Sequence, residues 1–89
     1  MKGIITVLGN DRVGIIAGVC SHLAESNVNI LDISQTIVKG FFNMVMIVDL
    51  DACNTSFEGL ADDLGKVGES LGVAIKIQHE DIFNTMHRI

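Results

Sequence analysis

The chain has 89 residues, of which 48% are hydrophobic and 19% charged, and its formal net charge is −5. This length fits a single domain. The acidic balance argues against a nucleic acid or an anionic membrane as partner, because both attract clustered Lys and Arg. A domain of this size cannot enclose so many apolar groups, so a homo-oligomer, most simply a dimer, is expected to bury the remainder.

The first strand is predicted over residues 4–8, a run of β-forming residues broken only by Thr6. A helix follows from Val13, with Asp11 as its expected N-cap and Ser26-Asn27 as its end. Residues at steps of three and four form its predicted apolar face: Val13, Ile16, Ala17, Cys20, Leu23 and Ala24. His22 falls on the opposite, solvated face.

Two long strands are predicted over residues 28–38 and 41–50, both rich in β-branched or large apolar residues. The intervening Lys39-Gly40 is typical of a two-residue turn, so the strands form a hairpin. In the second strand Phe42, Met44, Met46 and Val48 point to one face of the sheet and Val45 and Ile47 to the other. Both faces of the sheet are therefore expected to carry apolar side chains.

A second helix is predicted after Thr55 and Glu58, which have the spacing of a capping box. Its apolar stripe consists of Phe57, Leu60, Ala61, Leu64, Val67 and Leu71. Gly72 is the expected C-terminal stop. A fourth strand follows, in which Val73, Ile75 and Ile77 alternate with Ala74, Lys76 and Gln78.

The resulting order, βαββαβ, predicts an α+β fold: a ferredoxin-like plait whose four-stranded antiparallel sheet carries both helices on one face. Residues 1–78 account for this plait. Residues 79–89 form a C-terminal extension of the same domain with a helical apolar stripe of Ile82, Phe83, Met86 and Ile89. Because a helix this short is not stable alone, the extension is expected to dock on another surface.

Residues 9–14, GNDRVG, form a glycine-bearing turn between the first strand and the first helix. A phosphate-binding loop would need Lys and Ser or Thr directly after the second glycine, where Ile15 and Ile16 stand, so that chemistry is excluded. A helix N-terminus with free N–H groups still suits a carboxylate or another small anion. The alternative is that Gly14 only lets helix and sheet approach closely and Asp11 only caps the helix.

The stretch GNDRVGIIAGV, followed fifteen residues after Gly14 by Asn29 in SNVNILDISQT, resembles the ACT domain family. The resemblance covers residues 3–78 and is greatest to stand-alone ACT proteins and to the ACT segments of glycine-cleavage repressors and formyltetrahydrofolate deformylases. It implies a regulatory module that binds a small molecule, in many members an amino acid. This chain has Val13 where Pro is frequent, which leaves the turn less rigid and adds one N–H donor.

The resemblance also implies a ligand site between two subunits. One subunit would contribute the turn, Asn10, Asp11, Arg12, Val13 and Gly14, and its neighbour Asn29 and Ile30. Such a set matches an amino acid, because N–H groups donate hydrogen bonds to its carboxylate, Asp11 can pair with its ammonium, and Asn29 offers a donor and an acceptor.

RNA recognition is a rival interpretation, since RNA-binding plaits have the same element order and residues 39–46, KGFFNMVM, resemble their strand motif. The stacking positions argue against it. Asn43 and Met46 stand where aromatic residues would stack on bases, and Thr6 replaces the aromatic residue of the first strand.

Catalysis, metals and cofactors are not indicated by any residue pattern. Cys20 and Cys53 match no metal spacing and are expected to be free thiols. His79 and His87 are eight residues apart, about 80° around a helix, which disfavours a shared metal. We therefore predict no active site, no metal and no cofactor.

The favoured interpretation is a regulatory, allosteric module that binds an amino acid at a homodimer interface and acts on an enzyme or regulator protein. The alternative is a ligand-free structural domain that acts only through oligomerisation. No signal peptide or membrane-spanning stretch is evident in the sequence, which predicts a cytoplasmic protein without a membrane or nucleic-acid partner.

Overall fold

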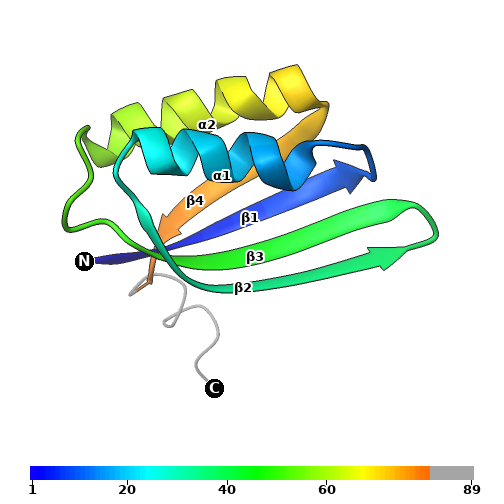
Figure 1. Cartoon of the computed structure of the whole chain (residues 1–89), viewed down its shortest axis with the longest axis horizontal. Coiled ribbons are helices and arrows are strands. Elements are labelled where there is room, and N and C mark those ends of the chain that lie inside the picture. Colours follow the sequence, from blue (N-terminus) through cyan, green and yellow to red (C-terminus); the bar gives the residue numbers. More distant parts are fainter. Residues whose placement is uncertain (81–89) are drawn as a thin grey trace.

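The computed structural model describes residues 1–80 (Figure 1). The elements are β1 (Lys2–Asn10), α1 (Ile15–Glu25), β2 (Asn29–Val38), β3 (Phe41–Asp49), α2 (Phe57–Leu71) and β4 (Val73–His79). The strands form one sheet in the order β2-β3-β1-β4, in which every neighbouring pair is antiparallel. Both helices lie on the same face of that sheet (Figure 1). The ferredoxin-like plait is thereby confirmed, whereas the predicted stripe of the C-terminal extension lies outside the described residues.

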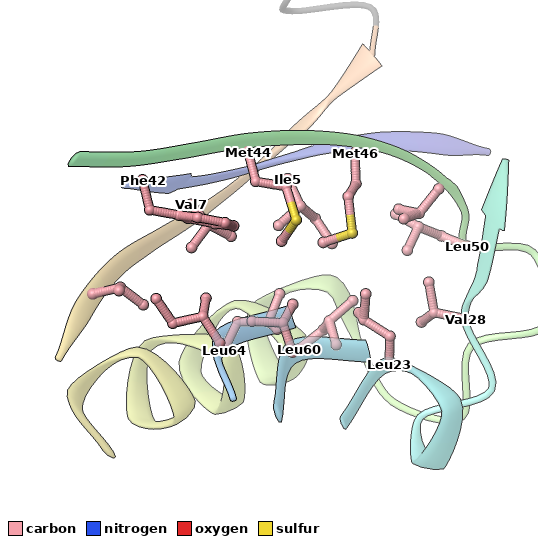
Figure 2. Packing of buried hydrophobic residues seen from close by; sticks show 14 residues of the cluster. Ile5, Val7, Leu23, Val28, Phe42, Met44, Met46, Leu50, Leu60 and Leu64 are labelled. Atoms are coloured by element: carbon pink, nitrogen blue, oxygen red, sulfur yellow. The ribbon is translucent and has the colours of Figure 1, made fainter. Parts of the chain in front are cut away.

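The core lies between the sheet and the two helices (Figure 2). The alternation predicted for β3 is confirmed, because Phe42, Met44, Met46 and Val48 are all buried in it. Their neighbours on β1 are Ile5 and Val7, each directly opposite a methionine of β3. Leu60 and Leu64 bring the predicted stripe of α2 onto this layer, and Phe57, Val67 and Leu71 pack at its margin.

The predicted apolar face of α1 is confirmed at Leu23, holds in part at the half-buried Cys20, and is wrong at its other positions. The buried residues of this helix are Ile15, Val19 and Leu23, whereas Val13 is fully exposed and Ile16 is 37% exposed. Both sets recur at helical spacing, so periodicity alone could not choose between them. The helix start accounts for Val13, which lies in the turn before α1 begins at Ile15, whereas packing against the core selects Ile15 over Ile16.

Both predicted N-caps are wrong, while both C-terminal stops are confirmed. The N-cap of α1 is Gly14 and not Asp11, and Gly14 has a left-handed backbone without a side-chain cap. In α2 the cap lies one residue later than Thr55: the Ser56 hydroxyl accepts a 3.0 Å hydrogen bond from the Gly59 N–H. Gly72 and Asn27 end their helices with φ of 75° and 60°, as expected for a left-handed C-terminal stop.

The hairpin turn is confirmed at Lys39 and Gly40, whose φ angles of 52° and 78° are both positive, as in the two-residue turns that suit strand twist. The hairpin leaves β2 at the edge of the sheet, where none of its residues is fully buried. Four of its apolar side chains are exposed by 44% or more: Leu31, Ile33, Ile37 and Val38. An exposed apolar edge strand is a template for pairing with another chain.

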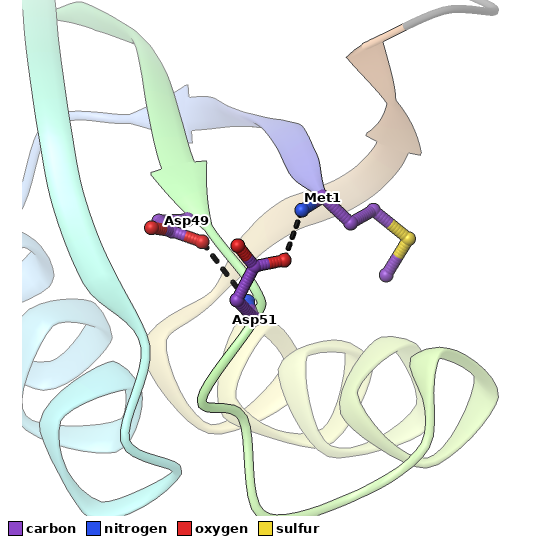
Figure 3. Close-up of polar contacts among 3 residues, drawn as sticks. All are labelled: Met1, Asp49 and Asp51. Atoms are coloured by element: carbon purple, nitrogen blue, oxygen red, sulfur yellow. Dashed lines mark hydrogen bonds and ion pairs between the residues drawn. The ribbon is translucent and has the colours of Figure 1, made fainter.

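The start of the chain is tied to the loop after β3 (Figure 3). The amino group of Met1 donates a hydrogen bond to the Asp51 carboxylate, and the Asp51 N–H donates one of 2.9 Å to the Asp49 carboxylate. The hydrogen bond to Asp51 raises the pKa of the Met1 amino group above its usual 8.0. These contacts hold the first residue of β1 beside the end of β3.

Candidate ligand-binding site

The β1–α1 turn, residues 10–14, is exposed along its whole length. One backbone contact fixes its position: the Asp11 N–H donates a 2.8 Å hydrogen bond to the carbonyl oxygen of Gly40 in the hairpin turn. Within residues 1–80, the carboxylate of Asp11 and the side-chain amide of Asn10 have no hydrogen-bond partner. Both side chains are therefore available to a ligand.

The N-terminus of α1 opens directly onto this turn. The first helical hydrogen bond runs from the Gly18 N–H to the Gly14 carbonyl, at 2.9 Å, so the N–H groups of residues 15–17 have no acceptor within the helix. Gly14 has φ 93°, and a Cβ added to it would meet no atom within 4 Å. The alternative in which Gly14 only lets helix and sheet approach closely is thus wrong; the residue is needed for its left-handed backbone.

The side chain of Arg12 reaches from the turn to the end of α2. Its Nη1 donates a 3.2 Å hydrogen bond to the carbonyl oxygen of Leu71, the last residue of α2. A Cβ at Gly72 would lie 2.7 Å from the same Nη1, so the glycine makes room for the guanidinium. A cation at a helix C-terminus is favourable to the helix dipole. Sequence reasoning missed this contact, because Arg12 and Leu71 are 59 residues apart.

Asn29 and Ile30 lie at the opposite end of the sheet from the turn. Asn29 pairs with Asp49, which pairs with Lys2 at the start of β1, whereas Asn10 ends β1. Lys2 and Asn10 are eight residues apart on β1, so Asn29 and the turn are separated by about 27 Å along the strand direction at the usual rise per residue. The structure therefore does not bring the seven predicted site residues together within one subunit.

A second copy paired antiparallel along β2 would bring these two halves close to each other. β2 ends at Val38, next to the hairpin turn; Val38 pairs with Phe41, and Phe41 pairs with Asn10. Antiparallel pairing of the two β2 strands would set Asn29 of the partner subunit beside Val38. That position is three strand spacings, about 14 Å, from Asn10. Ile37 faces the helix side there, because it pairs with the buried Phe42, and at 55% exposure it offers an apolar floor.

A small cavity lies away from the β1–α1 turn. Met1, Leu50, Cys53, Thr55, Phe57 and Leu60 line a cavity of about 30 Å³, room for one water molecule. Within residues 1–80, no three His, Cys, Asp or Glu side chains gather closely enough for a metal. Among the helices of that range, none is both long and apolar enough to cross a membrane.

The prediction that His22 lies on the solvated face of the first helix is wrong. Its side chain is only 21% exposed and lies between the helices, with Nε2 at 4.0 Å from the nearer carboxylate oxygen of Asp63. That nitrogen is buried and has no hydrogen-bond partner among the described residues. The two side chains belong to α1 and α2, and they lie apart from the β1–α1 turn.

The βαββαβ plait with both helices on one face of the sheet defines a class of small α+β domains, and the comparison with known families identifies which one. The ACT domain family model matches residues 3–78, so this chain belongs to the ACT domain family, as the GNDRVG turn and Asn29 suggested. Within it the chain is similar to the UPF0237 proteins. It is 56% identical to the one from Clostridium acetobutylicum, over 100% of both chains. The UPF0237 protein of Methanocaldococcus jannaschii is 52% identical over 97% of this chain and 96% of its own.

Two solved structures place the plait in different contexts. An ACT domain protein from Streptococcus pneumoniae superimposes with a TM-score of 0.83 and 43% identity, covering 93% of each chain. A formyltetrahydrofolate deformylase from Pseudomonas syringae superimposes with a TM-score of 0.80 and 25% identity. The match covers 88% of this chain but only 27% of the deformylase. The same plait thus occurs as a stand-alone chain and as one part of a larger enzyme.

Proposed function

We propose that this chain is a regulatory module that binds an amino acid, or a small metabolite with the same charged groups, between two subunits and transmits its presence to another protein. Membership of the ACT domain family supports the regulatory role. The open turn supports the ligand class, because it combines free N–H groups with an unpaired carboxylate. No residue is assigned a catalytic role.

Each part of the turn matches one group of an amino acid. The N–H groups of residues 15–17 and the positive end of the α1 dipole bind the α-carboxylate. The Asp11 carboxylate accepts hydrogen bonds from the α-ammonium, in a charge-assisted pair. Asn29 of the partner subunit contributes a donor and an acceptor, and Ile37 contacts the aliphatic part of the ligand.

The observation that carries this proposal is the separation of the two half-sites. Asn10 and Asn29 lie at opposite ends of one sheet, yet the exposed edge strand β2 allows a two-fold arrangement that joins the turn of one copy to Asn29 of the next. A ligand held in this way contacts both subunits. The binding free energy of the ligand then depends on how the two subunits are arranged, so the ligand can in turn favour one arrangement of the dimer.

Thermal unfolding against each of the twenty amino acids tests the proposal. A ligand at 100 times its dissociation constant adds about 2.7 kcal/mol of stability, and at least one amino acid is expected to raise the melting temperature by several degrees. Asp11→Asn should abolish that rise, whereas Asp62→Asn, on an exposed part of α2, should preserve it. A response equal in all three proteins would contradict binding at the turn.

Oligomerisation without a ligand is the second candidate, favoured by the exposed apolar residues of β2. Sedimentation distinguishes the cases. A dimer that forms at micromolar concentration, together with no response to any amino acid, would support a purely structural domain. A 9.6 kDa species alone would contradict both proposals.

A further inference from the structure

The face of the sheet opposite the helices carries a short apolar strip among polar residues. Ile4 pairs with Ile47, and Thr6 pairs with Val45, so these four side chains share that face. Asp32 and Ser34 flank the strip on β2, and Gln78 and Lys76 flank it on β4. The prediction of an apolar second face is therefore confirmed along this strip, and polar residues flank it on both edge strands.

Burial along the strip is uneven. Ile4 is 4% exposed, although no helix packs on its face and it stands outside the core cluster. Leu8, four residues further on the same strand and the same face, is 42% exposed. An open sheet face, with neighbours only to the side, leaves a side chain such as Leu8 partly in water. The difference in exposure between Ile4 and Leu8 indicates that another segment covers this face of the sheet at the Ile4 end.

The Ile4 end is also where the chain leaves the sheet. Gln78 pairs with Ile4 and His79 with Gly3, so β4 ends beside the strip. We propose that residues 81–89 of the same chain cover the strip, with the stripe Ile82, Phe83, Met86 and Ile89 packed on Ile4 and Ile47. Nine residues would span about 13 Å as a helix, which matches the three strand spacings, about 14 Å, from β4 to β2.

The charges at the two sides of the strip fit this placement. The covering segment leaves from β4, so Asp81 starts on the side of Lys76. Arg88 comes seven residues later, about 10 Å along a helix, and ends on the β2 side, where Asp32 shares the face of Ile47. With this cover in place, a second copy has the β2 edge, and not the open face, available for contact.

Disulfide trapping in the full-length chain tests the placement. In a Cys20→Ala, Cys53→Ala background, Ile47→Cys combined with Phe83→Cys should form an intrachain disulfide under mild oxidation. The rate should exceed at least tenfold that of the control pair Asp62→Cys with Phe83→Cys, because Asp62 lies on the exposed side of α2. Electrophoresis without reductant and peptide mass spectrometry separate the products.

Two results would overturn the proposal. Disulfide-linked dimers of the Ile47 pair would place the segment on a second copy, and a closure rate equal to that of the Asp62 pair would mean that residues 81–89 do not cover the strip. If Ile47→Cys fails to fold, Thr6→Cys with Phe83→Cys repeats the test at a polar position of the same face. Disulfide-linked dimers, or a closure rate equal to that of the Asp62 pair, would overturn the proposal in this second test as well.

Discussion

Arg12 in the β1–α1 turn donates a 3.2 Å hydrogen bond from Nη1 to the carbonyl oxygen of Leu71 at the end of α2. The turn is therefore attached at two points, through this side chain and through the backbone bond from Asp11 to Gly40. The first attachment fixes the turn against α2, and the second fixes it against the β2–β3 hairpin. Both hold the candidate ligand site in place before any ligand binds.

Arg12→Ala removes the first attachment and should lower the free energy of unfolding by about 1 kcal/mol, the net value of one hydrogen bond. Arg12→Lys keeps the charge near the helix C-terminus and should lose less. Urea unfolding of the three proteins provides the comparison. An alanine variant as stable as the parent would show that the guanidinium contributes nothing to the position of the turn.

Asp11→Ala and Asn29→Ala test the division of the site between subunits. Each variant alone should lose the response to the amino acid that stabilises the parent protein. When the two are unfolded together and refolded, mixed dimers carry one intact site, so about a quarter of all sites should return. Calorimetric titration counts them. If no sites are recovered although mixed dimers form, the two residues do not share a ligand across the interface.

Gly65 and Gly68 of α2 should respond in opposite directions to alanine. A Cβ at Gly65 meets nothing within 4 Å, so Gly65→Ala should stabilise the protein by about 0.5–1 kcal/mol through helix propensity. A Cβ at Gly68 would lie 2.6 Å from the carbonyl oxygen of Val73, so Gly68→Ala must displace β4 and destabilise the fold. Urea midpoints that shift in the same direction would contradict this packing of α2 on β4.

Ser56 and Thr55 separate the observed N-cap from the predicted one. Ser56→Ala removes the acceptor for the Gly59 N–H and should cost about 1 kcal/mol. Thr55→Ala should cost clearly less, and Ser56→Asp should retain the stability because aspartate also caps. Thermal unfolding ranks the variants. A larger loss at Thr55 than at Ser56 would restore the capping box as first predicted.

The Met1–Asp51 contact predicts a small stability change at alkaline pH. Because the pKa of the amino group is raised in the folded state, the contact contributes fully below pH 8, and its contribution is lost as the pH rises through the folded value. Both groups are more than half exposed, which keeps the effect small. Melting temperatures between pH 7 and 10 should fall more in the parent than in Asp51→Asn. Parallel pH profiles would mean that the contact does not contribute to stability.

Local patterns in the sequence were enough to predict the strands, the C-terminal ends of the helices and the protein family. The alternation of Phe42, Met44, Met46 and Val48 predicted the buried face of β3 because side chains alternate along any strand. Gly72 and the Lys39-Gly40 turn predicted chain reversals because few other residues adopt a positive φ. The GNDRVG turn, together with Asn29, was enough to indicate the ACT domain family.

Tertiary structure alone decided the face of α1 and the surroundings of the turn. Ile15, Val19 and Leu23 were buried in preference to Ile16, although Ile15 and Ile16 are the same residue type, because only the first three lie on the side of α1 that packs on the core. The partner of Arg12 and the distance between Asn10 and Asn29 depend on segments far apart in the chain. Such contacts arise from the way helices and strands pack, and no local pattern of residues encodes them.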